Sequence, residues 1–193
     1  MNNTKRLIFK TAVRLFARNG YEGTSVDQIA SACYMAKGTL YYYFRSKEEL
    51  FNYCVDLGMK VLKRNIMMRS VMETDPVKKI EKVIAIQFEL MEKYEKFIAL
   101  LFSQMWGENE RQGRLRGYIS EYLGILKHIF DECAEQGKVE KGKTEVMAAD
   151  LFGTMCSAML CHDILLPSVS LSRVVPDFTH VILKGVLSPE NGD

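Results

Sequence analysis

Residues 24–50 read TSVDQIASACYMAKGTLYYYFRSKEEL, and this stretch decides the fold. It contains two helix starts of the capping-box type, Ser25-x-x-Gln28 and Ser46-x-x-Glu49, in which the serine accepts from a first-turn N–H and the longer side chain reaches back. Between the two starts, apolar residues recur at helical spacing and predict two short helices. The predicted core-facing positions are Val26, Ile29, Ala30 and Cys33 in the first helix and Ala36, Leu40 and Phe44 in the second.

The outward face of the second short helix is polar and aromatic. Steps of 100° place Lys37, Gly38, Tyr41 and Tyr42 opposite the apolar stripe, with Thr39 to one side. Two short helices of which the second exposes such groups have the form of a helix-turn-helix, whose second helix enters the major groove of DNA. We expect Lys37 to reach a phosphate or a guanine edge and Thr39 a base edge or a thymine methyl. The tyrosine hydroxyls suit phosphates, and Gly38 lets the backbone approach closely.

The helix starts supply further candidates for phosphate contacts. Thr24 and Ser25 put hydroxyls and free N–H groups at a positive dipole end, which suits a phosphate oxygen. Lys47 stands at the start of the next helix and is a candidate of the same kind. Simpler interpretations remain open, in which Ser25 serves only as a helix cap and the three tyrosines at 41–43 serve only as packing for a small N-terminal head (residues 1–47).

The charge of the chain is distributed unevenly. Residues 1–47 hold eight Lys or Arg against two acids, a net charge of +6, and the remaining residues carry −4. A cationic head on an acidic body predicts that a polyanion contacts the head. The alternative is an ordinary solvated surface.

The quoted stretch resembles the DNA-binding signature of the tetracycline-repressor (TetR) family. The resemblance is carried by Lys-Gly-Thr-Leu-Tyr-Tyr-Tyr-Phe at 37–44 and Ser-Lys-Glu-Glu-Leu at 46–50, and by Leu15-Phe16 and Asn19-Gly20-Tyr21 before them. It implies a DNA-binding transcription regulator. The implied phosphate contacts are Thr24, Ser25, Tyr42, Tyr43 and Lys47, and the residues implied to lie nearest the bases are Lys37, Gly38 and Thr39.

The turn between the two short helices departs from the family pattern. Where the family has Ala-Gly-Val-Ser, this chain has Cys33-Tyr34-Met35-Ala36. Tyr34 replaces the glycine that most easily adopts a positive φ, a conformation awkward for a bulky residue. Ala36 removes the usual N-cap hydroxyl, which contributes about 1 kcal/mol. Both changes bear on the turn and on the pose of the second helix.

The rest of the chain predicts further helices separated by short breaks. A first helix ends at Asn19-Gly20 and turns Ile8, Ala12, Leu15 and Phe16 inward. The later helices are predicted from Ser46 towards Met72, from Asp75-Pro76 through Met91, from about Phe97 to Trp106, through Leu115 to Cys133, over about Thr144–Leu166, and from Pro167 to near Leu187. We therefore predict an all-α protein. Its domains are an N-terminal three-helix helix-turn-helix domain at residues 1–47 and a C-terminal helical effector-binding and dimerisation domain at residues 48–193.

The resemblance implies that the helical body (residues 48–193) binds an effector, and the composition of the body suggests which residues line the site. Large, adaptable apolar side chains suit a ligand pocket, although most such stripes are simply core. His162 and Asp163 form a polar pair inside an apolar stretch, either as a contact across a dimer interface or as a ligand anchor. The other ligand candidates are Phe88, Met91, Phe102, Met105, Trp106, Tyr118 and Tyr122.

The last two predicted helices are apolar enough to pack with their copies in a four-helix interface. Their apolar residues include Leu151, Phe152, Met155, Met159, Val181, Ile182 and Leu183. We expect a homodimer that presents two recognition helices to double-stranded operator DNA. The function expected is that of a repressor released by a hydrophobic or amphipathic small-molecule effector.

Other classes of site and compartment find less support. Five cysteines without a C-x-x-C pair and three scattered histidines indicate neither a disulfide framework nor a metal site, and no cofactor is predicted. Asp150 interrupts the apolar span Val146–Leu166, so we expect no membrane segment. With no secretory signal at the start, a cytoplasmic protein is expected.

Two rival functions remain open on the sequence. The first is an enzyme with a helical body that acts on a hydrophobic small molecule, although no Ser-His-Asp order, G-x-S-x-G elbow, Walker loop or dinucleotide fingerprint occurs. The second is a ligand-binding or architectural protein whose DNA head acts without an effector.

Overall fold

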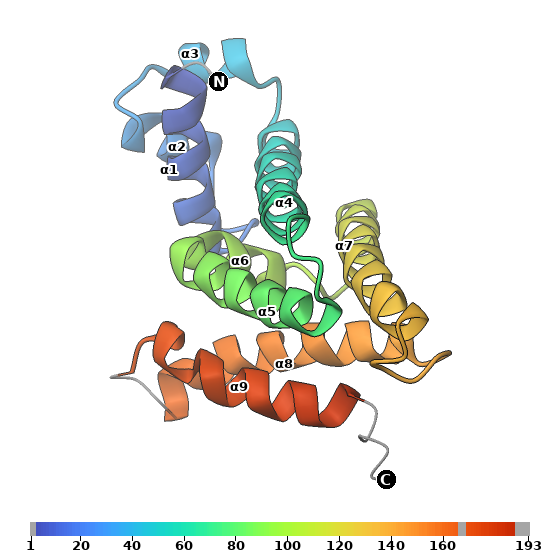
Figure 1. Cartoon of the computed structure of the whole chain (residues 1–193). Coiled ribbons are helices and arrows are strands. Elements are labelled where there is room, and N and C mark those ends of the chain that lie inside the picture. Colours follow the sequence, from blue (N-terminus) through green and yellow to red (C-terminus); the bar gives the residue numbers. More distant parts are fainter. Residues whose placement is uncertain (1–2, 166–168, 188–193) are drawn as a thin grey trace, which may run out of the picture. The chain divides into compact units, whose positions relative to one another are not determined.

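The chain is helical in the part that the structure describes. The computed structural model describes residues 3–165 and 169–187, apart from the side chains of residues 160–163 and 165. Within these residues Figure 1 shows helices and no sheet, and one isolated bridge pairs Val139 with Leu187. The all-α prediction is confirmed. The helices are α1 (Asn3–Asn19), α2 (Val26–Ala32), α3 (Lys37–Tyr43), α4 (Lys47–Ser70), α5 (Pro76–Lys93), α6 (Glu95–Ser103), α7 (Glu110–Glu135), α8 (Thr144–Leu165) and α9 (Leu171–Val186).

The helix starts follow the caps that the sequence predicts, with one difference. The Ser25 hydroxyl accepts from the Gln28 N–H at 3.1 Å, and the Gln28 side chain accepts from the Ser25 N–H at 2.8 Å. At the start of α4 the Ser46 hydroxyl accepts from the Glu49 N–H at 3.0 Å. The Glu49 carboxylate, however, accepts from the Arg45 N–H at 2.7 Å instead of from that of Ser46. The capping box predicted at Ser46 is therefore completed through the N–H of Arg45, one residue earlier in the chain than predicted.

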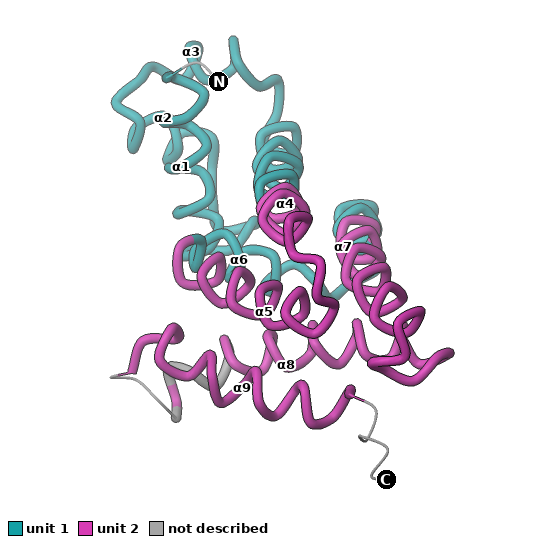
Figure 2. The backbone as a smooth tube through the Cα atoms, in the orientation of Figure 1, with its two compact units in different colours: residues 1–61, 94–116 teal, residues 62–93, 117–193 magenta. Residues whose placement is uncertain are grey.

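The chain forms two compact units, shown in Figure 2. The first comprises residues 1–61 and 94–116, and the second comprises residues 62–93 and 117–193. The helices α4 and α7 contribute residues to both units. These units group residues by contact, whereas the predicted boundary at residue 47 separates functions and stays a prediction.

An aromatic cluster forms the centre of the first unit. Phe16 of α1 stacks on Tyr21 with ring centroids 5.7 Å apart, and Phe51 of α4 meets both rings edge to face. Ile8 and Phe16 are completely buried, as the predicted stripe on α1 requires, whereas Leu15 is half-buried. Through this face α1 packs against α2 and α6.

Within the same unit, α4 and α6 approach each other closely at a glycine. A Cβ atom added at Gly58 would lie 2.1 Å from Cζ of Phe97, whose side chain is buried. Such a distance is far below van der Waals contact, so the Phe97 ring occupies the space that any other residue at position 58 would need.

The second unit is arranged around α5, which contacts α8 and α9. The ring of Phe88 on α5 lies 5.1 Å from that of Phe178 on α9, and Tyr122 on α7 lies 6.2 Å from Phe152 on α8. The buried face of α5 is apolar except for Gln87, which is 1% exposed.

We expect Gly58→Ala to lower the free energy of unfolding by about 1–2 kcal/mol, because overpacking against Phe97 outweighs the better helix propensity of alanine. Gly124→Ala is the matched control, since Gly124 lies on the exposed side of α7 with open space at its Cβ position. This control should gain up to about 1 kcal/mol. Thermal or urea unfolding measures both free energies. If both substitutions changed the free energy of unfolding equally and in the same direction, the close approach of Phe97 to Gly58 would be contradicted.

Candidate nucleic-acid interface and effector site

The turn between α2 and α3 keeps the left-handed conformation expected of a glycine, but here it is formed by a tyrosine. Tyr34 has a φ of 56° and is 97% exposed. Its N–H donates to the Ser31 carbonyl at 3.0 Å, and the Met35 N–H donates to the Ala30 carbonyl at 3.0 Å. These backbone bonds end α2 and direct the chain into α3.

The seven residues of α3 are held from one side. Leu40 and Phe44 are 1% and 4% exposed, and Tyr43 is half-buried. Ala36, which we predicted to face the core, is instead exposed as the N-cap of α3, with an extended backbone and no side-chain cap bond. The prediction for Ala36 is wrong because the helix starts one residue later. The exposed residues of α3 are Lys37, Gly38, Thr39, Tyr41 and Tyr42.

An ion pair joins the exposed sides of α2 and α3. The Lys37 ammonium lies 2.8 Å from each oxygen of the Asp27 carboxylate, and both side chains are more than half exposed. The hydrogen bond to Asp27 and its charge raise the pKa of the Lys37 amine. Asp27 is therefore a polar group of the same surface, although the sequence analysis did not select it.

Gly38 has open space where a side chain would project. An added Cβ atom would meet nothing within 4 Å. Packing inside the chain therefore does not require glycine at this position. Its small size leaves the backbone of α3 accessible to an external partner.

The two predicted phosphate ligands at the start of α2 occupy different environments. Ser25 is exposed and forms the capping box described above. Thr24 is 1% exposed, and its hydroxyl points to the backbone carbonyls of Gly20 at 2.7 Å and Leu15 at 3.2 Å. Its position favours a role in fixing the loop that precedes α2.

Lys47 is held beside an aromatic ring and an acid. Its ammonium donates to the Tyr21 carbonyl at 3.0 Å, lies 4.3 Å from the centroid of the Tyr21 ring, and is 3.9 Å from the Glu22 carboxylate. The Arg111 guanidinium covers the same ring at 3.6 Å and pairs with Glu22 at 3.4 Å. Burial raises the pKa of the Tyr21 hydroxyl, and the Arg111 charge opposes that rise. These contacts fix Lys47 at the start of α4.

In the second unit, a buried amide lies among apolar side chains. Neither polar atom of the Gln87 side chain has a hydrogen-bond partner within the described residues. Burial raises the pKa of the Tyr122 hydroxyl, and the neighbouring Gln87 amide opposes that rise. Each unpaired buried polar group of this kind costs about 1–3 kcal/mol. The pair Gln87–Tyr122 is thus a buried polar point among apolar side chains.

The ligand candidates predicted from the sequence divide between the two units. Phe88, Met91 and Tyr122 are buried in the second unit, and Tyr118 is half-buried there. Phe102, Met105 and Trp106 belong to the first unit, and Trp106 is 83% exposed, so it lines no interior site of the chain. The side chains of His162 and Asp163 lie outside the described residues.

The described residues contain neither a cluster of metal-ligand type nor a membrane-spanning helix. No group of three or more His, Cys, Asp or Glu side chains lies close enough there to hold a metal ion. None of the described helices is both long and apolar enough to cross a membrane.

The comparisons with known proteins agree with the geometry of the first unit. Residues 8–54 match the family of bacterial regulatory proteins, tetR family. Over 106 residues the chain is 35% identical to the HTH-type transcriptional regulator YerO of Bacillus subtilis, which covers 54% of this chain and 37% of YerO. A solved Clostridium perfringens structure, assigned to the regulation of fatty acid metabolism, is 33% identical with a TM-score of 0.87, covering 95% of this chain and all of that one. The chain belongs to the TetR family of helix-turn-helix transcription regulators.

A further solved structure shares the fold of this TetR-family chain. The transcriptional regulator FadR of Bacillus subtilis, in complex with stearoyl-CoA, is 22% identical with a TM-score of 0.82 over 93% of this chain and 98% of that one. The chain spans less than half the length of the curated relatives that it matches first, 37% of one and 46% of the next. The TetR family is a family of regulators and not of enzymes.

Two polar residues of this TetR-family chain, Gln87 and Asp27, are absent from the sites predicted from the sequence. Gln87 interrupts the apolar stripe of α5, and that interruption was a readable signal. Asp27 carried no such signal, because its importance depends on the distance between α2 and α3.

Asp27→Ala tests the ion pair at the TetR-type surface. The change removes a negative charge from the head and frees Lys37, so binding to non-operator duplex should tighten several-fold. The plot of log affinity against log salt should steepen by about one, because one more phosphate is neutralised. Fluorescence anisotropy at several salt concentrations measures both. Glu121→Ala is the control, since Glu121 pairs with Lys63 in the second unit. Equal salt slopes for Asp27→Ala and wild type would show that Asp27 does not keep Lys37 from a phosphate.

Proposed function

We propose that this TetR-family regulator binds operator DNA as a homodimer, represses transcription, and leaves the operator when a hydrophobic small molecule binds its body. The observation that carries the proposal is the division of α3 into a buried side and an exposed side. Leu40 and Phe44 fix the helix from within, while Lys37, Thr39 and Tyr42 remain accessible to a partner. That partner is a duplex because these groups match phosphates and base edges.

The proposed DNA contacts fall into two groups. Lys37, Gly38 and Thr39 approach the bases from the start of α3, where the open space at Gly38 permits close contact. The phosphates are contacted by Ser25, Tyr41, Tyr42, Tyr43 and Lys47, while Thr24 positions the loop before α2. A net charge of +6 over residues 1–47 supports this assignment, because phosphate contacts supply most non-specific affinity.

Dimerisation through α8 and α9 is supported by apolar side chains that the single chain leaves in solvent. Val146 and Ile164 on α8 are 70% and 76% exposed, and Val181 on α9 is 66% exposed. Large apolar surface of this kind commonly marks an interface. A two-fold dimer presents two copies of α3 to two half-sites of an operator.

The effector that we propose is an acyl thioester of coenzyme A or a molecule of similar polarity. Two observations support this class. The buried Gln87 amide and the Tyr122 hydroxyl provide a polar point beside the Phe88–Phe178 and Tyr122–Phe152 ring pairs. A thioester carbonyl next to an acyl chain has the same combination of polar and apolar groups. Among the relatives, FadR was solved with stearoyl-CoA, and the Clostridium perfringens protein is assigned to fatty acid metabolism.

The DNA-binding part of the proposal is tested by the double substitution Lys37→Ala and Tyr42→Ala. Both side chains are exposed, so the fold should be unchanged by circular dichroism. We expect operator affinity to fall by about 100-fold, since each lost contact is worth about 1.4 kcal/mol. Wild-type binding should weaken steeply with salt. If the double variant bound the selected operator as tightly as wild type, the proposed function would be wrong.

The effector part is tested with a series from butyryl-CoA to stearoyl-CoA, with free coenzyme A as control. A cognate thioester should release the operator and raise the melting temperature, since a ligand at 100 times its Kd stabilises by about 2.7 kcal/mol. Gln87→Leu should weaken this response about tenfold and leave the unliganded protein equally or more stable, because the substitution removes an unpaired buried amide. No response to any thioester would exclude the effector class and leave the DNA-binding role standing.

A further inference from the structure

Tyr34 combines a strained backbone with an unused side chain. Its φ of 56° lies in the left-handed region, and among the described residues no other non-glycine residue has a positive φ. A bulky residue disfavours this conformation because its Cβ atom crowds the neighbouring carbonyl oxygen. Glycine would therefore fit the turn better than tyrosine.

No interaction inside the described chain offsets this disadvantage. The two hydrogen bonds of the turn, to the carbonyls of Ser31 and Ala30, are donated by backbone N–H groups and would form with glycine as well. The Tyr34 side chain is 97% exposed, so it buries almost no apolar area. The turn uses the left-handed backbone but not the tyrosine side chain, and a strained residue whose side chain the fold does not use points to an external contact.

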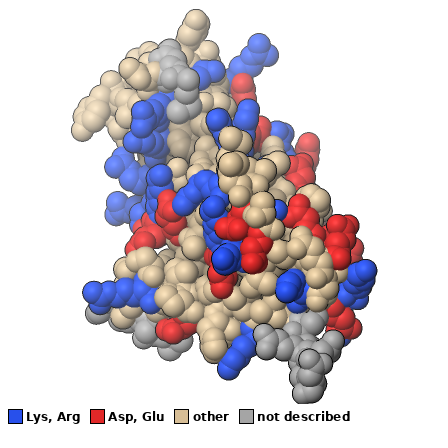
Figure 3. All heavy atoms as spheres, viewed as in Figure 1, with Lys and Arg blue, Asp and Glu red and all other residues tan. Residues whose placement is uncertain are grey.

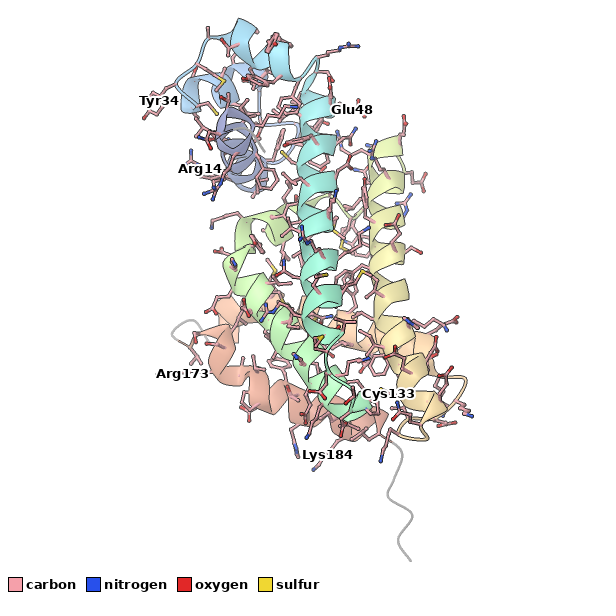
Figure 4. The ribbon with its side chains drawn as sticks, turned by 45° about the horizontal axis from the view of Figure 1, so that its top comes forward. Arg14, Tyr34, Glu48, Cys133, Arg173 and Lys184 are labelled. Carbon is pink, nitrogen blue, oxygen red and sulfur yellow. The ribbon has the colours of Figure 1, made fainter. Side chains whose placement is uncertain are left out.

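The basic charge of the same N-terminal region favours a polyanion as that contact. One side of α1 carries four exposed basic residues at four-residue intervals: Arg6, Lys10, Arg14 and Arg18. Like charges at this spacing destabilise a helix, so local helix stability does not explain them. Figure 3 shows basic side chains gathered over this part of the head, and Figure 4 shows Tyr34 projecting away from the ribbon on the same side as Arg14 in that view.

A protein partner is less consistent with this surface. Within residues 3–47 the exposed large apolar side chains are Leu7, Tyr34, Tyr41 and Tyr42, and three of these four carry a hydroxyl. Protein interfaces use contiguous apolar patches, and tyrosines set among basic and polar side chains do not form one. Tyrosine suits a nucleic-acid backbone, since its ring packs on a sugar and its hydroxyl donates to a phosphate.

We propose that Tyr34 is a further DNA contact, with its ring against a deoxyribose and its hydroxyl on a phosphate of the strand that borders the groove entered by α3. This inference rests on the proposed function, because it assumes that α3 enters a groove. Tyr34 stands three residues before Lys37, the first residue of α3, so the same docking that inserts α3 brings the turn to the edge of the groove. A backbone contact adds affinity at every sequence and carries no base specificity.

The experiment uses Tyr34→Gly and Tyr34→Phe in the full chain, with a duplex of roughly 30 base pairs selected from random sequence by the wild-type protein. For Tyr34→Gly we expect opposite effects on two readouts. The melting temperature should rise by roughly 2–4 °C as the strain is relieved, and operator affinity by anisotropy should fall about tenfold. Tyr34→Phe should lose part of the affinity, because only the hydroxyl is removed. Phosphate ethylation interference should disappear at one flanking position in each half-site.

Two controls separate this proposal from its alternatives. Gly124→Ala should raise the melting temperature without changing operator affinity, which excludes stability itself as the cause. Lys37→Ala should weaken binding in any case, and its failure to do so would overturn the proposed function as well. If Lys37→Ala weakens binding but Tyr34→Gly does not, the inference about Tyr34 alone is wrong. It is also wrong if Tyr34→Gly reduces only the cooperative loading of a second dimer with the ethylation pattern intact, since the partner is then another copy of the chain.

Discussion

The position of α3 depends on the burial of Leu40 and Phe44. A helix of seven residues is far shorter than the roughly 12–15 residues that an isolated helix needs to be even marginally stable in water. Its N-cap also lacks a side-chain bond, so local interactions contribute little. Packing of these two side chains therefore imposes both the helix and its orientation. The opposite face is free to carry polar groups, because no part of the core depends on it.

The exposed surface of the head is adjusted by interactions that limit its charge. Asp27 pairs with Lys37, and Glu22 lies near both Lys47 and Arg111. A surface with unpaired cations alone would bind any duplex, whereas a paired lysine must exchange its carboxylate for a DNA group. The pairs also hold the lysines in defined places before binding, which lowers the entropy lost in the complex. We expect moderate affinity with greater discrimination as the physical consequence of these pairs.

The sequence predicted the local elements better than the contacts between them. Capping boxes, Pro76 and the apolar stripes located the helices because these signals act within a few residues. The exposure of the α3 side chains followed from helical periodicity, since Leu40 and Phe44 define its inner face. The burial of Thr24, the exposure of Trp106 and the ion pair of Asp27 depend on distances between elements, which periodicity does not encode. Gln87 was visible as a polar residue in an apolar stripe, but its unpaired state required the structure.

We propose that the outward face of α3 lies in the major groove and that its buried face holds it there. Methylation interference on the selected operator tests this directly, because a methyl group on guanine N7 projects into the major groove and one on adenine N3 projects into the minor groove. The account predicts that N7 methylation at guanines of both half-sites blocks binding. Interference confined to adenine N3, or none at any base, would contradict it.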